Sequence, residues 1–169
     1  MQTLALLQRV LALVCRSVVG LAFFALIVVV MIQITTRTFG LPSPVWTEEL
    51  SRYLLLYLVA FGVGLSLMTG ELVNVDLLQE TVPEKAAWVM RLVAAASTAI
   101  LGAVMIWPAW RFTKIGAFQQ SPSLRWPMDI IHASVLMLSV LLCLFALLRV
   151  IGMLAGADDG RPQYVEEPE

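Results

Sequence analysis

Four long apolar runs without any charged residue constrain this chain more than any other feature. Each run contains at least 18 consecutive residues that lack Asp, Glu, Lys and Arg. The hydrocarbon core of a bilayer is about 30 Å thick, and about 20 helical residues cross it. In lipid the backbone must satisfy its own hydrogen bonds, so such runs are predicted to be α-helices. The runs are residues 17–36, 53–70, 92–110 and 130–148.

The composition agrees with a membrane protein and excludes a soluble domain of this length. Of the 169 residues, 60% are hydrophobic and only 14% are charged, which leaves too little polar surface to cover a core in water. A membrane β-barrel would show short segments of alternating polarity, and the sequence has none. We therefore predict an all-α integral membrane protein with four transmembrane helices and short amphipathic interfacial helices.

Three regions follow from this pattern. Residues 1–16 form an amphipathic N-terminal segment that either lies on the membrane or extends the first span on the cytoplasmic side. Residues 17–151 form the four-helix transmembrane domain, and residues 152–169 form an acidic tail that we expect to be disordered. Within the domain, apolar residues share one face of residues 72–82, which predicts a short interfacial helix between the second and third spans.

Glycine, proline and hydroxyl residues mark the expected ends of the helices. Gly40 is expected to take a left-handed conformation after the first span, and Pro42 to block continuation of that helix. Ser43 or Thr47 is the expected N-cap of the second span. Pro108 is expected to kink or end the third span, because proline removes a backbone donor.

A charged collar stands directly before the second apolar run. It contains Trp46, Glu48, Glu49 and Arg52. The two carboxylates lie in the first turns of the helix, where its dipole favours negative charge, and Glu48 precedes Arg52 at the i,i+4 spacing that favours ion pairing. Two interpretations stay open: the collar caps and anchors the helix, or it contacts a neighbouring helix or subunit.

Small residues recur every fourth position on two of the spans. Such stripes allow another helix to approach closely within a membrane. We therefore predict helix-packing roles for two sets of residues. These are Gly62, Ser66 and Gly70 on the second span, and Ala94, Thr98 and Gly102 on the third.

The sequence lacks the residues that chemistry in a membrane would need. His132 is the single histidine, so paired axial ligands for haem are missing. Cys15 and Cys143 are far apart and form no C-x-x-C motif. The span centres hold no ionisable residue that would bind a charged substrate. We therefore predict no catalytic residue, no metal and no cofactor, and a scaffold or partner role.

Several segments together resemble a known family. They are the sequence WTEELSR at residues 46–52, the sequence GELVNVD at residues 70–76, Arg37 before the first loop, and Pro83 and Pro127 in later connections. With four spans over residues 17–151, the chain resembles the DctQ-type small membrane subunit of tripartite ATP-independent periplasmic (TRAP) transporters. One position departs: the family often has a histidine where this chain has Leu72.

The resemblance implies a division of labour among three proteins. A periplasmic binding protein captures the substrate, commonly an organic acid, and a large membrane subunit carries it with an ion. The small subunit is then a non-catalytic scaffold in the bacterial inner membrane, bound stably to the large subunit and transiently to the binding protein. The resemblance also implies that both termini are cytoplasmic, although the basic residues divide six to five between the two sides and leave orientation open.

The expected interface follows from this resemblance. The residues expected to anchor the chain or contact a partner are Arg37, Trp46, Glu48, Glu49, Arg52 and Asp76. Two alternatives remain beside the TRAP interpretation. One is the small subunit of another tripartite carboxylate transporter, and the other is a membrane redox or enzyme subunit.

Overall fold

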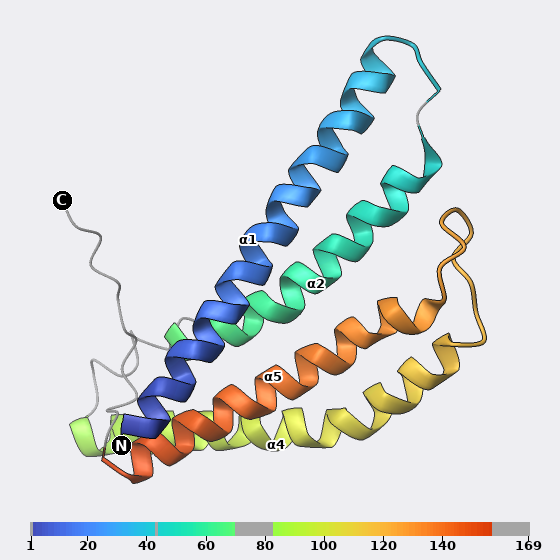
Figure 1. Ribbon diagram of the computed structural model, residues 1–169. Coiled ribbons are helices and arrows are strands. Elements are labelled where there is room, and N and C mark those ends of the chain that lie inside the picture. The colour runs from blue at the N-terminus through green and yellow to red at the C-terminus, as the bar shows by residue number, and fades with distance from the viewer. Residues whose placement is uncertain (1, 43, 70–82, 157–169) are drawn as a thin grey trace, which may run out of the picture.

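The computed structural model is a bundle of long helices (Figure 1). It describes residues 2–42, 44–69 and 83–156. Within these ranges the elements are α1 (Gln2–Thr38), α2 (Val45–Thr69), α4 (Glu84–Gly116) and α5 (Met128–Leu154). Each helix is long and apolar enough to cross a membrane, which confirms the predicted all-α membrane fold with four spans.

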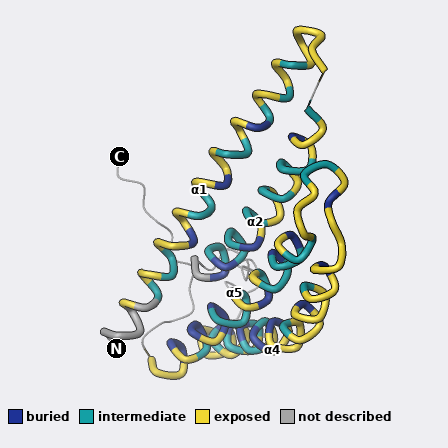
Figure 2. The backbone as a smooth tube through the Cα atoms, turned by 45° about the vertical axis from the view of Figure 1, so that its right-hand side comes forward, coloured by how far each residue is buried: buried dark blue, intermediate teal, exposed yellow. Residues whose placement is uncertain are grey.

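The helices pack in an order that differs from their order in the chain. α1 lies against α2, α2 against α5, and α5 against α4. Helix α5 is the central element, since 44% of its most apolar window is buried compared with 11% for α1. Figure 2 shows the same contrast, with the outer side of α1 exposed along most of its length.

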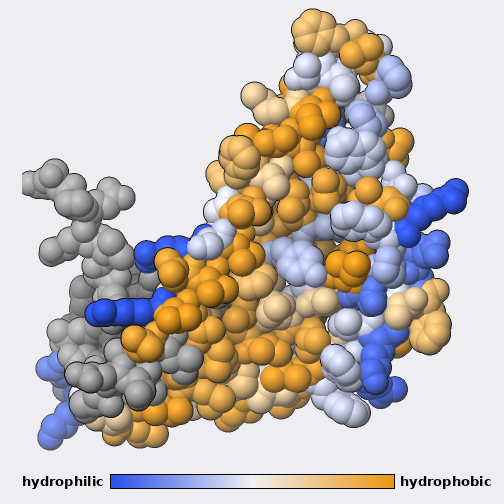
Figure 3. All heavy atoms as spheres, in the orientation of Figure 1, coloured by the Kyte–Doolittle hydropathy of each residue, from blue (hydrophilic) through white to orange (hydrophobic). Residues whose placement is uncertain are grey.

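All four helices contribute to one hydrophobic core. This core lies toward the end of the bundle where α1 and α4 begin and α2 and α5 end, which we call the terminal end. Its buried members are Cys15 from α1, Leu67 from α2, Ala99 from α4, and Leu141, Phe145 and Ala146 from α5. The face of the bundle seen in Figure 3 is also largely hydrophobic, as a lipid environment requires.

The first connection has the predicted end signal. Gly40 has φ 67°, and the N–H of Leu41 donates to the carbonyl of Thr36 at 2.9 Å. This six-to-one bond after a left-handed glycine closes α1 in a Schellman motif. The expected left-handed conformation of Gly40 is confirmed.

Thr47 does not act as predicted, and Pro108 shows only that one of its two predicted effects is absent. The hydroxyl of Thr47 donates to the carbonyl of Pro44 at 2.7 Å instead of accepting a bond as an N-cap, and the alternative cap, Ser43, lies outside the described residues. Helix α4 continues through Pro108 to Gly116. Pro108 therefore does not end the helix, and the alternative effect, a kink caused by the missing donor, stays a prediction.

Several predicted features fall at or beyond the limits of the described chain. The N-terminal segment and the first span are one continuous helix from Gln2. The predicted interfacial helix at residues 72–82, with Gly70 and Asp76, lies outside the described residues. Helix α5 extends to Leu154, three residues into the region expected to be a tail, and residues 157–169 lie outside the described part.

Candidate partner interface

Glu49 ties the start of α2 to the connection between α4 and α5. Its Oε1 accepts a hydrogen bond from the backbone N–H of Ser123 at 2.9 Å, and its Oε2 accepts one from the N–H of Leu124 at 3.0 Å. Both carboxylate oxygens are therefore committed within the chain. A carboxylate that accepts two backbone N–H groups forms charge-assisted bonds, which fix this connection against α2.

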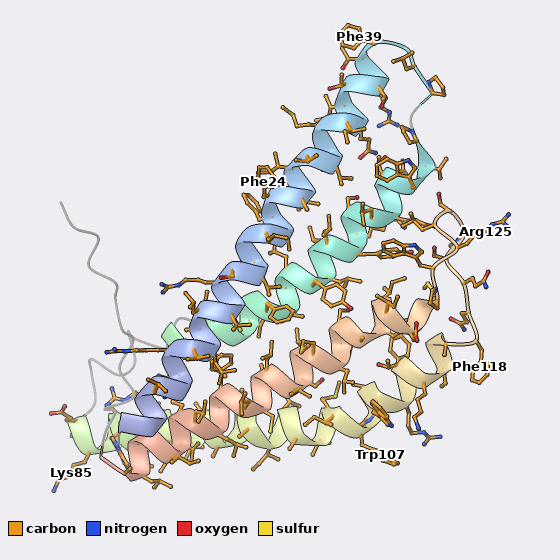
Figure 4. All side chains as sticks on the ribbon, viewed as in Figure 1. Phe24, Phe39, Lys85, Trp107, Phe118 and Arg125 are labelled. Atoms are coloured by element: carbon orange, nitrogen blue, oxygen red, sulfur yellow. The ribbon has the colours of Figure 1, made fainter. Side chains whose placement is uncertain are left out.

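The connection that Glu49 holds, residues 117–127, is a compact loop with its own backbone hydrogen bonds. The N–H of Ser121 donates to the carbonyl of Trp126 at 2.8 Å, and the N–H of Met128 donates to the carbonyl of Gln119 at 2.9 Å. Arg125 has φ 53°, an uncommon conformation for a residue with a side chain. Figure 4 shows Arg125 and Phe118 pointing away from the helices, and Phe118 is 92% exposed.

Two further polar contacts lock α5 to its neighbours near this loop. The hydroxyl of Tyr57 in α2 donates to the carbonyl of Ile130 in the first turn of α5. The Nδ1 atom of His132 lies 3.1 Å from the carbonyl oxygen of Phe112, and the His132 and Phe112 rings stack with centroids 3.8 Å apart. His132 thus has the hydrogen-bonding role that its interfacial position suggests.

The remaining collar residues face outward. Glu48 and Arg52 are exposed, and Trp46 is 37% exposed. Arg37, which lies in the last turn of α1 and outside the collar, is exposed as well. No ion pair joins Glu48 to Arg52 within the described ranges, so the predicted i,i+4 pair is not formed. The collar therefore divides into Glu49, which binds the chain's own loop, and a set of charges that is open to a partner.

The small residues of α4 and α2 meet their surroundings in different ways. A Cβ atom at Gly102 would lie 2.8 Å from the backbone nitrogen of Cys143, so α4 and α5 approach closely here. At Gly62 a Cβ atom would meet nothing within 4 Å, whereas at Gly64 it would lie 2.9 Å from the ring of Phe145. Within α2, close contact with α5 therefore falls on Gly64.

The other members of the predicted stripes are half-buried. Ala94, Thr98 and Ser66 all fall in this class. The hydroxyl of Thr98 donates to the carbonyl of Ala94 at 2.9 Å. This hydroxyl therefore has its hydrogen-bond partner within its own helix and needs none on a neighbouring helix.

Arg149 makes a contact inside the bundle that the sequence did not indicate. Arg149 in α5 is 7% exposed, and its Nη1 donates to the carbonyl of Leu67 at 3.1 Å. Because Leu67 lies in the last turn of α2, the positive charge of the guanidinium matches the negative end of the dipole of that helix. The sequence signal was a lone cation ending an apolar run, which is more typical of an interfacial anchor.

The described residues offer no metal site. No group of three or more His, Cys, Asp or Glu residues within them is placed to hold a metal ion. The polar side chains that the structure brings together, among them Glu49, Tyr57, His132 and Arg149, contact the chain's own backbone. This arrangement fixes the helices relative to one another.

A comparison of the sequence with models of protein families matches most of the chain. Residues 26–156 match the family described as "Tripartite ATP-independent periplasmic transporters, DctQ component". The chain belongs to the DctQ family. The match covers 131 of the 169 residues and includes α2, α4, α5 and about the last third of α1. No curated protein matches the chain significantly.

Membership of the DctQ family confirms the resemblance seen in the sequence. This DctQ chain is a multi-pass membrane protein and a component of a TRAP transporter. The family is a transporter component and not a known enzyme family, which argues against the redox or enzyme alternative. It also favours the TRAP system over the other tripartite carboxylate system.

Proposed function

We propose that this chain is the non-catalytic small membrane subunit that holds the large subunit of a TRAP transporter in the bilayer. The large subunit would then carry organic acids, delivered by a periplasmic binding protein and coupled to an ion. The observation that supports this proposal is that polar side chains inside the bundle form hydrogen bonds with the chain's own backbone. Glu49, Tyr57 and Arg149 bind backbone atoms of neighbouring helices or loops, as a rigid support requires.

We propose the exposed side of α2 as part of the contact with the large subunit. Glu48, Arg52, Leu55 and Val59 are exposed on α2, and their spacing of three or four residues places them on one side of the helix. Gly62 continues this side and has open space around it. A partner helix with a complementary charge near its end would pair with Arg52 and pack closely at Gly62.

The proposed orientation would put both termini in the cytoplasm of a bacterium, and the opposite end of the bundle, with the collar and residues 117–127, in the periplasm. The collar and residues 117–127 would then face the compartment that holds the binding protein. Glu49 contributes indirectly in this proposal, because it positions the loop and does not itself reach a partner. Arg125 and Phe118, which project from the loop, would be available to the binding protein.

The test is reconstitution of transport from separate components. The chain, the large subunit, or both would be placed in proteoliposomes with the substrate-loaded binding protein and an ion gradient. We expect uptake of labelled organic acid only when both membrane subunits are present. Uptake by this chain alone would contradict the proposal.

A charge reversal tests the proposed surface. Arg52→Glu is expected to lower recovery of the two-subunit complex, because it replaces an exposed cation on the proposed contact with an anion. Lys85→Glu is the matched control, since Lys85 is an exposed cation at the terminal end. Equal recovery of both variants would exclude Arg52 from the interface.

A further inference from the structure

Helix α1 is much longer than one membrane crossing. Its 37 residues extend about 55 Å at 1.5 Å per residue, whereas the hydrocarbon core is about 30 Å thick. The uncharged stretch between Arg16 and Arg37 is about 30 Å long by the same rise. One crossing therefore fits between these two arginines, and the helix before Arg16 continues beyond it.

The part of α1 before this crossing carries two exposed cations on one side. Arg9 and Arg16 are seven residues apart, which places them within about 20° of each other around the helix and about 10 Å apart along it. Both side chains are exposed. Helix α1 contains no Asp or Glu, and neither arginine forms an ion pair in the described part of the chain.

Large apolar side chains flank the two arginines on the exposed side. Leu6 and Leu13 are each 67% exposed, Val10 is 52% exposed and Val14 is 50% exposed. The opposite side of this segment packs into the core through Cys15. The exposed side thus combines an apolar stripe with an adjacent cationic stripe, which is the pattern of a helix at the boundary of a bilayer.

We propose that Arg9 and Arg16 bind the phosphate groups of anionic phospholipids, with Leu13 and Val14, which lie within one turn of Arg16, at the boundary of the acyl chains. The apolar stripe favours a lipid as the ligand of this surface. A soluble acidic protein or free phosphate would match the arginines but leave Leu13 and Val14 in water, whereas a phospholipid covers the arginines and these apolar side chains together. Figure 3 shows hydrophilic atoms projecting from the hydrophobic surface near the N-terminal end of α1.

This surface is separate from the proposed contact with the large subunit. Arg9 and Arg16 precede residues 26–156, which match the DctQ family. They also lie toward the terminal end, away from Arg52 and the loop. The lipid contact would set the depth of α1 in the membrane. Arg9 and Arg16 are about 10 Å apart along the helix, and contacts with headgroups at both positions would oppose sliding of the helix along its axis.

The experiment uses the full-length protein in nanodiscs of phosphatidylcholine, with fluorescent phosphatidylglycerol as the probe. Binding is measured by energy transfer from a dye coupled near the N-terminus. Each basic residue near an anionic surface contributes about fivefold in affinity. We expect about fivefold weaker enrichment of the probe for Arg9→Gln and about thirtyfold for Arg9→Gln with Arg16→Gln.

Two controls separate charge from structure. Arg9→Lys with Arg16→Lys keeps both charges and is expected to retain most of the enrichment. Arg125→Gln removes an exposed cation from the loop 117–127 and is expected to leave the signal near α1 unchanged. If the double glutamine variant failed to insert, the single variant Arg9→Gln would still give the test, because Arg9 lies beyond the uncharged crossing.

Three outcomes would overturn the proposal. The first is enrichment by the double glutamine variant equal to that of the wild type. The second is equal enrichment of phosphatidylcholine labelled with the same dye, which would show that charge plays no part. The third is complete displacement of the probe by inorganic phosphate, which would identify the arginines as a site for a free anion. Failure here would leave the transporter proposal untouched, since that proposal is tested by uptake.

Discussion

A single methyl group at Gly102 should force α4 and α5 apart. A Cβ atom there would lie 2.8 Å from the nitrogen and 2.9 Å from the Cα of Cys143, where ordinary contact begins near 3.4 Å. The helices must therefore separate by about 0.6 Å, which forfeits a quarter or more of the dispersion energy of the contacts affected. Overpacking of this kind costs about 1–3 kcal/mol.

The size of the effect follows from two opposing terms. The backbone atoms of Cys143 cannot rotate away, so we expect Gly102→Ala to cost about 2–3 kcal/mol by overpacking. Alanine gains about 1 kcal/mol over glycine in a helix interior, which leaves a net loss of about 1–2 kcal/mol. At about 2–4 °C per kcal/mol for a chain of this size, the unfolding temperature should fall by about 2–8 °C.

Gly62→Ala is the matched control, because a Cβ atom there meets nothing within 4 Å. It should gain about 1 kcal/mol from helix propensity alone and raise the unfolding temperature by about 2–4 °C. Both variants are compared in one detergent by intrinsic fluorescence, for which the five tryptophans provide the signal. A Gly102→Ala protein as stable as the wild type would refute the close approach of α4 and α5.

Three further substitutions test the contacts at the two ends of the bundle. Glu49→Ala should speed hydrogen exchange at the amides of Ser123 and Leu124, measured by mass spectrometry, and unchanged exchange would contradict the clamp. Tyr57→Phe removes one neutral hydrogen bond and should lower the free energy of unfolding by about 1 kcal/mol, with no change counting against a bond to α5. Arg149→Met should cost about 1.5–3 kcal/mol, because a charged donor to a helix carbonyl is lost, and a thermal scan equal to the wild type would refute that role.

The fold was predictable because a helix that crosses a membrane must meet a simple requirement of length and hydrophobicity. Each crossing needs a run of about 20 apolar residues, and such runs are visible without knowledge of any contact. The end of α1 was predictable for a similar reason, since Gly40 acts through its own backbone and the bond to it spans only neighbouring residues. Local chemistry therefore accounts for these successes.

The contacts between helices were less predictable, because the spacing of small residues in the sequence does not show which side of a helix faces its neighbour. Gly62 and Gly64 are two residues apart, and so point about 200° away from each other around α2; only the packing shows that Gly64 meets Phe145. Glu49 and its loop partners are more than 70 residues apart. The sequence indicated that Glu49 makes a specific contact but not with which group. The structure shows that its carboxylate binds the chain's own backbone.

The most direct test of the central claim is the composition of the complex in its native membrane. The protein would be purified in a mild detergent, and the intact assembly weighed by native mass spectrometry. A scaffold subunit predicts a one-to-one complex with a large polytopic membrane protein, and no transport by this chain when that partner is removed. Isolation of the chain alone or as a homo-oligomer that still transports organic acids in liposomes would contradict the account.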